Sequence, residues 1–167
     1  PLRDVYKRQV YKIVSMEDDQ GVMHDTIKLS NNAEKVSTPG KKQVWRITSR
    51  AKGKSEGDYI TFADTDVNAL DEINMFHPTY TYINKTVRDF DAVPLLVPIY
   101  DKGQLIYDLP SLDEIKAYAT KELDELWNEY KRVLNPQDYP VDLAKDVWDN
   151  KMTLIDNVRK KAHNLPE

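Results

Sequence analysis

Lys35-Val-Ser-Thr-Pro-Gly-Lys-Lys-Gln-Val-Trp-Arg-Ile47 joins a sharp corner to a strand-like run, and the neighbouring elements are predicted outward from it. Pro39 has a fixed φ and Gly40 tolerates a positive φ, so this pair predicts a tight turn. The turn delivers Lys41 and Lys42 to the start of the strand. Such a basic corner is either a site for a phosphate or carboxylate or a solvated β-turn, and the pattern leaves both interpretations open.

The charge of the chain changes sign around this corner. The whole chain has a formal net charge of -4. Every ionisable residue from 35 to 55 is nevertheless basic: Lys35, Lys41, Lys42, Arg46, Arg50, Lys52 and Lys54. A nucleic-acid-binding hairpin is one interpretation of this cluster, and it predicts salt-sensitive binding to oligonucleotides. The acidic balance of the whole chain favours the absence of a nucleic-acid partner, because nucleic-acid-binding domains usually carry a basic excess.

The composition is that of a globular protein, with 40% hydrophobic and 31% charged residues among 167. Cysteine is absent, which excludes disulfides, zinc–thiolate sites and thiol catalysis and fits a reducing cytoplasm. The longest apolar-rich stretch, Ala92 to Tyr100, is interrupted by Pro94 and Pro98 and is far shorter than the roughly 20 residues of a membrane-spanning helix. We therefore expect a soluble cytoplasmic protein with no membrane partner.

The first nine residues are expected to be foreign to the fold. The chain begins with Pro1, and Asp4-Val-Tyr-Lys-Arg-Gln9 resembles the translated end of an adapter used in preparing sequencing libraries. Residues 1–9 would then be a scar, with the natural reading frame resuming near Val10. A natural basic N-terminal segment is the alternative.

Alternating hydrophobicity predicts strands on both sides of the corner. Before it, the candidates are a strand at Val10–Met16, a short strand at Thr26–Ser30 and a helical turn at Asn31–Glu34. After it, Gln43–Thr48 places Trp45 and Ile47 on one face, and Tyr59–Ala63 is a second strand. The polar residues 50–58 between these two strands predict a hairpin with a loose loop.

The middle of the chain is predicted to contain more strands. In the segment 64–76, the spacing of Val67, Leu70 and Ile73 favours a helix. Thr79–Val87 alternates Thr and Tyr as a strand does. A further hairpin is predicted from Leu95–Tyr100 and Gln104–Tyr107, joined by a turn that contains Asp and Gly.

Two amphipathic helices are predicted after residue 107. Ser111 and Glu114 form a capping-box pattern, and an apolar 3–4 spacing continues from there to Val133. A second helix is predicted at about Leu143–Ala162, with basic residues at its C-terminal end. Strands followed by helices indicate an α+β fold, in which antiparallel strands and hairpins precede two C-terminal helices.

Local motifs do not assemble a catalytic site. His24, His77 and His163 have no spacing that suggests a shared metal site, and the acidic pairs at 17–19 and 64–66 lack the glycine framework of a calcium loop. Walker, dinucleotide-binding and nucleophile-elbow motifs are absent. The sequence thus predicts no catalytic residue and no metal ligand.

Several separated motifs resemble bacterial nicotinate phosphoribosyltransferase. Lys35 to Arg46 resembles the segment that follows the barrel of that family, with the pattern Lys-x-x-(Thr or Asn)-Pro-Gly-x-Lys-x-x-aromatic-Arg. Val10-Tyr-Lys-Ile-Val14 is similar to the strand after the phosphate-binding turn. The other matching motifs are Phe76–Tyr82, Lys85–Arg88, Ala92–Leu96 and the helix that begins at Ser111. The resemblance runs from about Val10 to the end of the chain.

The resemblance implies a C-terminal part of a type II phosphoribosyltransferase fold that lacks most of the barrel. Residues 10–107 would be a strand-rich post-barrel segment and 108–167 a helical extension. The implied reaction joins nicotinate to phosphoribosyl pyrophosphate and gives nicotinate mononucleotide, with ATP and Mg²⁺ serving the parent enzyme and none bound to this part alone. The parent is expected to be a homodimer.

Within the matching motif, the candidate substrate-binding residues are Thr38, Gly40, Lys42 and Arg46. The catalytic residues of the family lie in the barrel, so the resemblance implies that this part alone is inactive. The alternative to a part of such an enzyme is a stand-alone α+β interaction module without catalysis.

Overall fold

The computed structural model describes residues 11–163, and they form two compact units. The larger unit is Lys42–Lys145, and the smaller combines the chain up to Lys41 with the chain from Asp146 onward. The expected scar at residues 1–9 lies outside the described residues, and the predicted domain boundary at 107/108 stays a prediction. None of the helices described is both long enough and apolar enough to span a bilayer.

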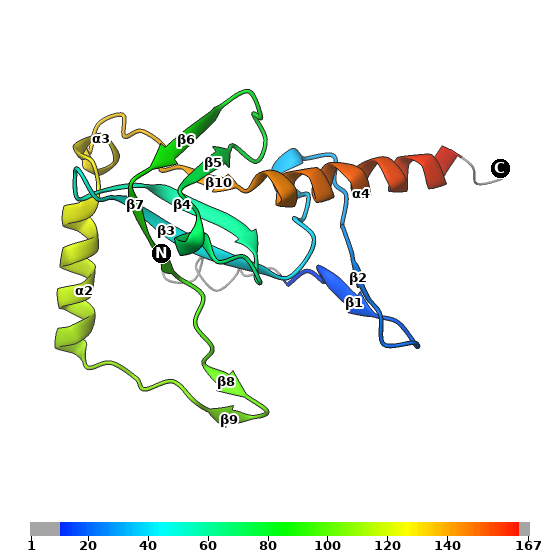
Figure 1. Cartoon of the computed structure of the whole chain (residues 1–167), viewed down its shortest axis with the longest axis horizontal. Helices are drawn as coiled ribbons and strands as arrows, with labels where there is room; N and C mark the ends of the chain where they lie inside the picture. The colour runs from blue at the N-terminus through cyan, green and yellow to red at the C-terminus, as the bar shows by residue number, and fades with distance from the viewer. Residues whose placement is uncertain (1–10, 164–167) are drawn as a thin grey trace. The chain divides into compact units, whose positions relative to one another are not determined.

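The larger unit is built on a mixed six-stranded sheet (Figure 1). The strand order is β6-β5-β10-β4-β3-β7, and each neighbouring pair is antiparallel except β10 and β4, which are parallel. The strands are β3 (Lys42–Ser49), β4 (Lys54–Phe62), β5 (Glu72–Phe76), β6 (Asn84–Arg88), β7 (Phe90–Pro94) and β10 (Val141–Leu143). The predicted α+β fold is confirmed, although not every strand pair is antiparallel.

The core of this unit begins at β3, where the predicted alternation is confirmed. Trp45 and Ile47 are buried, and Arg46 between them is only partly buried. Trp45 lies opposite Tyr59 of β4, and its indole N–H donates to the hydroxyl of Thr61 at 3.0 Å. Met75 of β5 is fully buried in the same unit. A two-residue period therefore sorts the apolar side chains onto one face of the sheet.

The β3–β4 connection is tighter than predicted. The prediction of a loose loop at 50–58 is wrong, because β4 already begins at Lys54 and the chain turns within residues 50–53. The register shifts at Ile47/Thr48, so β4 contains a bulge. At Gly57 (φ 135°) a Cβ would lie 3.0 Å from the carbonyl oxygen of Pro140. Small and polar residues occur in this strand because a neighbouring backbone approaches it closely.

The helix predicted in the segment 64–76 is wrong. The 3-10 turn η2 (Val67–Ala69) is capped by the carboxylate of Asp66, which accepts from the amide of Asn68. Strand β5 follows, with Ile73 and Met75 buried and the residue between them exposed. The same apolar residues fit a three-residue and a two-residue period, and pairing with β6 selects the strand.

The strand predicted at Thr79–Val87 is shorter and later, since β6 begins at Asn84. Residues 78–83 form the turn between β5 and β6. His77 organises that turn, because its Nδ1 accepts the amides of Thr79 at 3.1 Å and Tyr80 at 2.9 Å. A side-chain acceptor that competes for backbone amides favours a turn over a longer strand.

The hairpin predicted across 95–107 is reduced to β8 (Tyr100–Asp101) and β9 (Gln104–Leu105), a separate two-stranded ribbon (Figure 1). The predicted turn between them is confirmed, but Leu95–Ile99 is not a strand. The strand that joins the main sheet is instead β7, which pairs with β3 and ends at Pro94. Proline lacks the amide that a longer ladder would require.

The first helix, α2 (Leu112–Glu125), starts as predicted. Ser111 and Glu114 form the capping box, with the Ser111 amide donating to Glu114 at 2.7 Å. The predicted continuation to Val133 is wrong, because the backbone is extended at residues 126 and 127 before the short helix α3 (Asn128–Lys131). Strand β10 then follows, so one short strand lies between the predicted C-terminal helices.

The second predicted helix is α4 (Lys145–His163), and Leu143, expected in it, belongs to β10. In the smaller unit, α4 lies with β1 (Ser15–Glu17), β2 (Met23–Asp25) and the 3-10 turn η1 (Ala33–Lys35). The predicted strands at Val10–Met16 and Thr26–Ser30 are replaced by the β1–β2 pair. Asn150 of α4 donates to Asp25 at 2.7 Å and ties the helix to this pair.

Candidate functional site

The Pro39–Gly40 corner is buried and belongs to the smaller unit. Gly40 has φ 82°, which confirms the predicted positive φ, and its amide donates to the carbonyl of Val14 at 2.9 Å. One turn earlier, the hydroxyl of Ser37 accepts the amide of Lys28 at 2.8 Å. The corner is thus held by backbone groups from two distant segments, and a side chain at Gly40 would be strained.

The four candidate substrate-binding residues are divided between the two units. Thr38 and Gly40 lie in the smaller unit, and Lys42 and Arg46 lie on β3 of the larger one. They are close in sequence but belong to different units, so they are not assigned to one site. Their role in substrate binding stays a prediction.

Arg46 is the centre of a charged cluster inside the larger unit. Its Nε and Nη2 donate to the two carboxylate oxygens of Asp58 at 3.0 and 3.2 Å, and its Nη1 contacts Glu122. Asp58 lies opposite Arg46 in the β3–β4 register, whereas Glu122 is on α2. The hydrogen bond that Arg46 donates to Asp58 is the largest factor that raises the pKa of Arg46, and Glu122 adds to it. The bidentate pair with Asp58 joins β3 to β4, and the contact with Glu122 fastens α2 to the sheet.

Tyr139 completes the cluster from the segment before β10. Its hydroxyl donates to Asp58 at 3.0 Å and lies 2.6 Å from the hydroxyl of Ser55. Burial raises the pKa of Tyr139 to about 12, so the phenol is a neutral donor near pH 7. The guanidinium of Arg46 lies 5.8 Å from the centre of its ring, within the range of a cation–π contact.

A cavity of about 250 Å³ lies beside this cluster, lined in part by Arg46, Glu122, Leu126 and Tyr139. Its charged groups already pair with one another, so the arrangement is suited to joining β3, β4 and α2. Arg46 was predicted from the sequence as a site residue, whereas Asp58, Glu122 and Tyr139 were not. No local signal indicates them, because Glu122 is 76 residues from Arg46 and Tyr139 lies in no predicted element.

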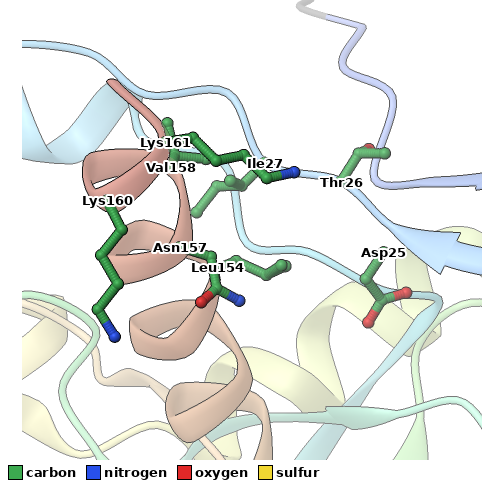
Figure 2. Close-up of a pocket in the computed structure, with 8 residues that line it drawn as sticks. All are labelled: Asp25, Thr26, Ile27, Leu154, Asn157, Val158, Lys160 and Lys161. Atoms are coloured by element: carbon green, nitrogen blue, oxygen red, sulfur yellow. The ribbon is translucent and has the colours of Figure 1, made fainter. Parts of the chain in front are cut away.

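The cavity in Figure 2 belongs to the smaller unit and has a volume of about 440 Å³. It lies between the chain at Asp25–Ile27 and the C-terminal half of α4. Lys161 extends toward the side of Thr26, whereas Lys160 points the other way (Figure 2). The carboxylate of Asp25 is already bonded to Asn150. Exposed lysines that flank an open hollow do not define a binding site.

The histidines have structural partners. His24 lies 2.7 Å from the carboxylate of Asp18, and His163 contacts the carbonyl of Arg159 at 3.0 Å. Within residues 11–163, no group of three or more His, Asp or Glu side chains could hold a metal ion.

The fold and its charged cluster define an α+β domain whose polar groups largely stabilise its own packing. A family model described as the nicotinate phosphoribosyltransferase C-terminal domain matches residues 41–151. Nicotinate phosphoribosyltransferase of Bacillus subtilis (strain 168) is 47% identical over 152 residues, which cover 91% of this chain and 31% of that protein. The human protein of the same name is 30% identical over 136 residues, covering 81% of this chain and 24% of its own length.

Solved structures give the same result. The crystal structure of human nicotinic acid phosphoribosyltransferase matches with a TM-score of 0.64 and 28% identity, covering 71% of this chain and 24% of that chain. The chain belongs to the nicotinate phosphoribosyltransferase C-terminal domain family. It spans less than a third of the length of these relatives.

Proposed function

We propose that this chain is the C-terminal part of an enzyme that joins nicotinate to phosphoribosyl pyrophosphate and forms nicotinate mononucleotide, with coupled ATP hydrolysis, in NAD salvage. The observation that carries the proposal is the 47% identity with the Bacillus subtilis protein along 91% of this chain. The match of residues 41–151 to the C-terminal domain family supports it independently. The part alone is expected to be inactive.

Within that enzyme, the main role of this domain is proposed to be structural. The reaction needs cationic and amide groups that stabilise a ribosyl cation and a departing pyrophosphate. Arg46 is paired with Asp58 and Glu122, so its geometry favours holding β3 and α2 over binding a phosphate. The corner at Thr38 and Gly40, with Lys42 after it, is the part proposed to approach the phosphate end of the substrate.

Mg²⁺ and ATP are proposed for the whole enzyme. When bound, the magnesium would neutralise phosphate charge, and the rest of the polypeptide would have to supply its ligands, since residues 11–163 contain no fitting group. The homodimer and the cytoplasmic location belong to the same proposal.

A chimeric enzyme tests the proposed function. In the Bacillus subtilis protein, the matching C-terminal 31% is replaced by this chain from Val10 onward. The expected result is formation of nicotinate mononucleotide that requires both nicotinate and phosphoribosyl pyrophosphate, whereas the isolated chain forms none. A chimera that keeps the parental circular dichroism spectrum but has no activity would contradict the proposal.

Replacing Lys42 with Ala in this chimera tests the phosphate role of the corner. We expect a raised KM for phosphoribosyl pyrophosphate with kcat nearly unchanged, because a ground-state phosphate contact is lost. Lys52→Ala, which removes an exposed lysine of the β3–β4 turn, is the matched control. An unchanged KM in the Lys42 variant would remove the phosphate role.

The stand-alone interaction module is distinguished by the genomic locus. An in-frame barrel-coding region upstream of Val10 supports the enzyme. A start codon at that position supports the module.

A further inference from the structure

A second cavity in the larger unit, of about 350 Å³, is not explained by the proposed function. It lies where β10 and the end of β5 meet the segment that follows α3. The polar side chains that matter to its chemistry are His77, Lys85, Tyr130, Asp138 and Asp142.

Asp142 is unusual among the side chains that line this cavity. It lies in the middle of β10 and is only 6% exposed. Among residues 11–163, its carboxylate has neither a hydrogen bond nor an ion pair with another side chain. Pairing of β10 with β4 on one side and β5 on the other holds its backbone in place. Its side chain lines the cavity, and a donor bound there would supply the hydrogen bonds that no described side chain makes.

The other charged groups of the wall leave a negative excess. The amine of Lys85 contacts the carbonyl of Glu56 and lies 3.3 Å from its carboxylate, so its charge is already offset. The Nδ1 of His77 accepts two backbone amides, which places the proton of the neutral ring on Nε2. Asp138 and Asp142 have no ion pair among the described residues, although the positive charge of Lys85 also acts on Asp142.

We propose that this cavity binds a compact cation with N–H donors, a guanidinium or a primary ammonium group, through the carboxylate of Asp142. A planar guanidinium can donate to both carboxylate oxygens, and the ring of Tyr130 offers a cation–π surface. Asp138 adds a second negative charge on the same wall. This chemistry is found in a small amine ligand and in an arginine or lysine side chain of another polypeptide segment.

The test is a calorimetric titration of the full chain with butylguanidinium and butylammonium at pH 7. Neutral butylurea, which has a similar shape, is the matched ligand control. Either cation is expected to bind at least tenfold more tightly than butylurea. Asp142→Asn should lose at least tenfold in affinity for that cation, whereas Asp113→Asn, at an almost fully exposed position of α2, should not.

Circular dichroism of each variant shows whether it is folded. If Asp142→Asn does not fold, the comparison of each cation with butylurea on the unsubstituted chain decides. Failure of both cations to bind would overturn the proposal, as would unchanged affinity in folded Asp142→Asn. Because the measurement needs no catalysis, it is independent of the proposed enzymatic function.

The chimera distinguishes the two sources of the cation. Binding of the probe to both the isolated chain and the chimera supports a free ligand. Binding to the isolated chain alone supports a side chain from the remainder of the polypeptide that already occupies the cavity.

Discussion

Single residues in the larger unit connect segments that are far apart in the sequence. Arg46 joins β4 through Asp58 and α2 through Glu122, and Tyr139 reaches Asp58 from the segment before β10. All four side chains are partly buried, so each donor that is lost leaves an acceptor that water only partly reaches. Their contribution to stability is therefore expected to exceed that of exposed ion pairs.

Replacing Arg46 with Met measures this contribution. We expect the free energy of unfolding to fall by about 1–3 kcal/mol, because two carboxylates lose their partner while the apolar stem is largely kept. Urea unfolding followed by tryptophan fluorescence checks it. The control is Arg88→Met, whose exposed pair with Glu72 is worth at most about 1 kcal/mol. Equal effects of the two variants would contradict the structural role of Arg46.

The buried phenol of Tyr139 predicts a loss of folding stability at alkaline pH. Burial raises its pKa from the ordinary 10.0 to about 12, so the folded state keeps the phenol proton where the unfolded state releases it. The resulting stability is complete below pH 10 and is lost as the pH rises through 12. Tyr139→Phe should thus lose less stability between pH 9 and 11 than the unsubstituted chain in urea unfolding, and Tyr82→Phe, at an exposed position, should not differ from it.

The opposite dependence of stability on pH is predicted for Lys151. Burial and the nearby charge of Lys12 lower the pKa of its amine below the ordinary 10.5. The unfolded state then binds more protons than the folded state in the range just below pH 10.5, so this group's contribution is lost as the pH falls through the folded pKa. Lys151→Met should raise the midpoint of thermal unfolding at pH 7, whereas Lys160→Met, at an exposed position of the same helix, should leave it nearly unchanged.

At the scale of elements, α2 depends on its N-terminal cap more than on packing. Its residues from 112 to 121 are exposed. Two contacts that join it to the sheet are that of Glu122 with Arg46 and that of the Asp124 carbonyl, which accepts from Lys54 at 2.6 Å. A helix with few tertiary contacts relies on local interactions for its stability. The capping box at Ser111 is one such local interaction.

Ser111→Ala is expected to destabilise α2 by about 0.5–2 kcal/mol, because the first turn loses the acceptor for one of its amides. Faster amide hydrogen exchange in residues 112–121 would report this opening, with β3 and β4 unaffected. Thr120→Ala, in the middle of the same helix, is the control. Equal exchange in the two variants would show that the cap is dispensable.

At the scale of the whole molecule, the isolated chain exposes an unusual amount of apolar surface. Leu112, Ile115 and Leu123 follow the predicted stripe of α2, yet about half or more of each side chain is exposed. Tyr100, Leu105, Ile106 and Leu109 of the β8–β9 region are exposed to a similar degree. An apolar stripe of this kind normally packs against another surface.

We therefore expect the isolated chain to self-associate and to bind a hydrophobic dye. The double variant Ile115→Lys and Leu123→Lys should reduce both the dye fluorescence and the sedimentation coefficient, because charges interrupt the stripe. Ala117→Lys, at an exposed position of α2 off the stripe, is the matched control. A monomeric unsubstituted chain without dye binding would contradict this expectation.

Local sequence patterns accounted for much of the framework. The Pro39–Gly40 corner, the alternation of β3 and the start of α2 were predicted correctly, because a fixed φ, a two-residue period and a capping box act within a few residues. The end of α2 and strand β5 were not, since the apolar spacing continues past residue 125 and also fits a helix in the segment 64–76. There the choice depends on distant pairing partners.

Pairings between segments that are far apart in the chain were not predicted from the sequence. Strand β10 inserts in parallel beside β4, with Val141 opposite Asp58, and the Arg46–Glu122 contact spans 76 residues. The sequence around Asp142 does not predict the cavity that this side chain lines. Periodicity records which side of an element is apolar, but not which element will cover it. That choice is made only when all the elements pack together, because burial and hydrogen bonding are then satisfied jointly.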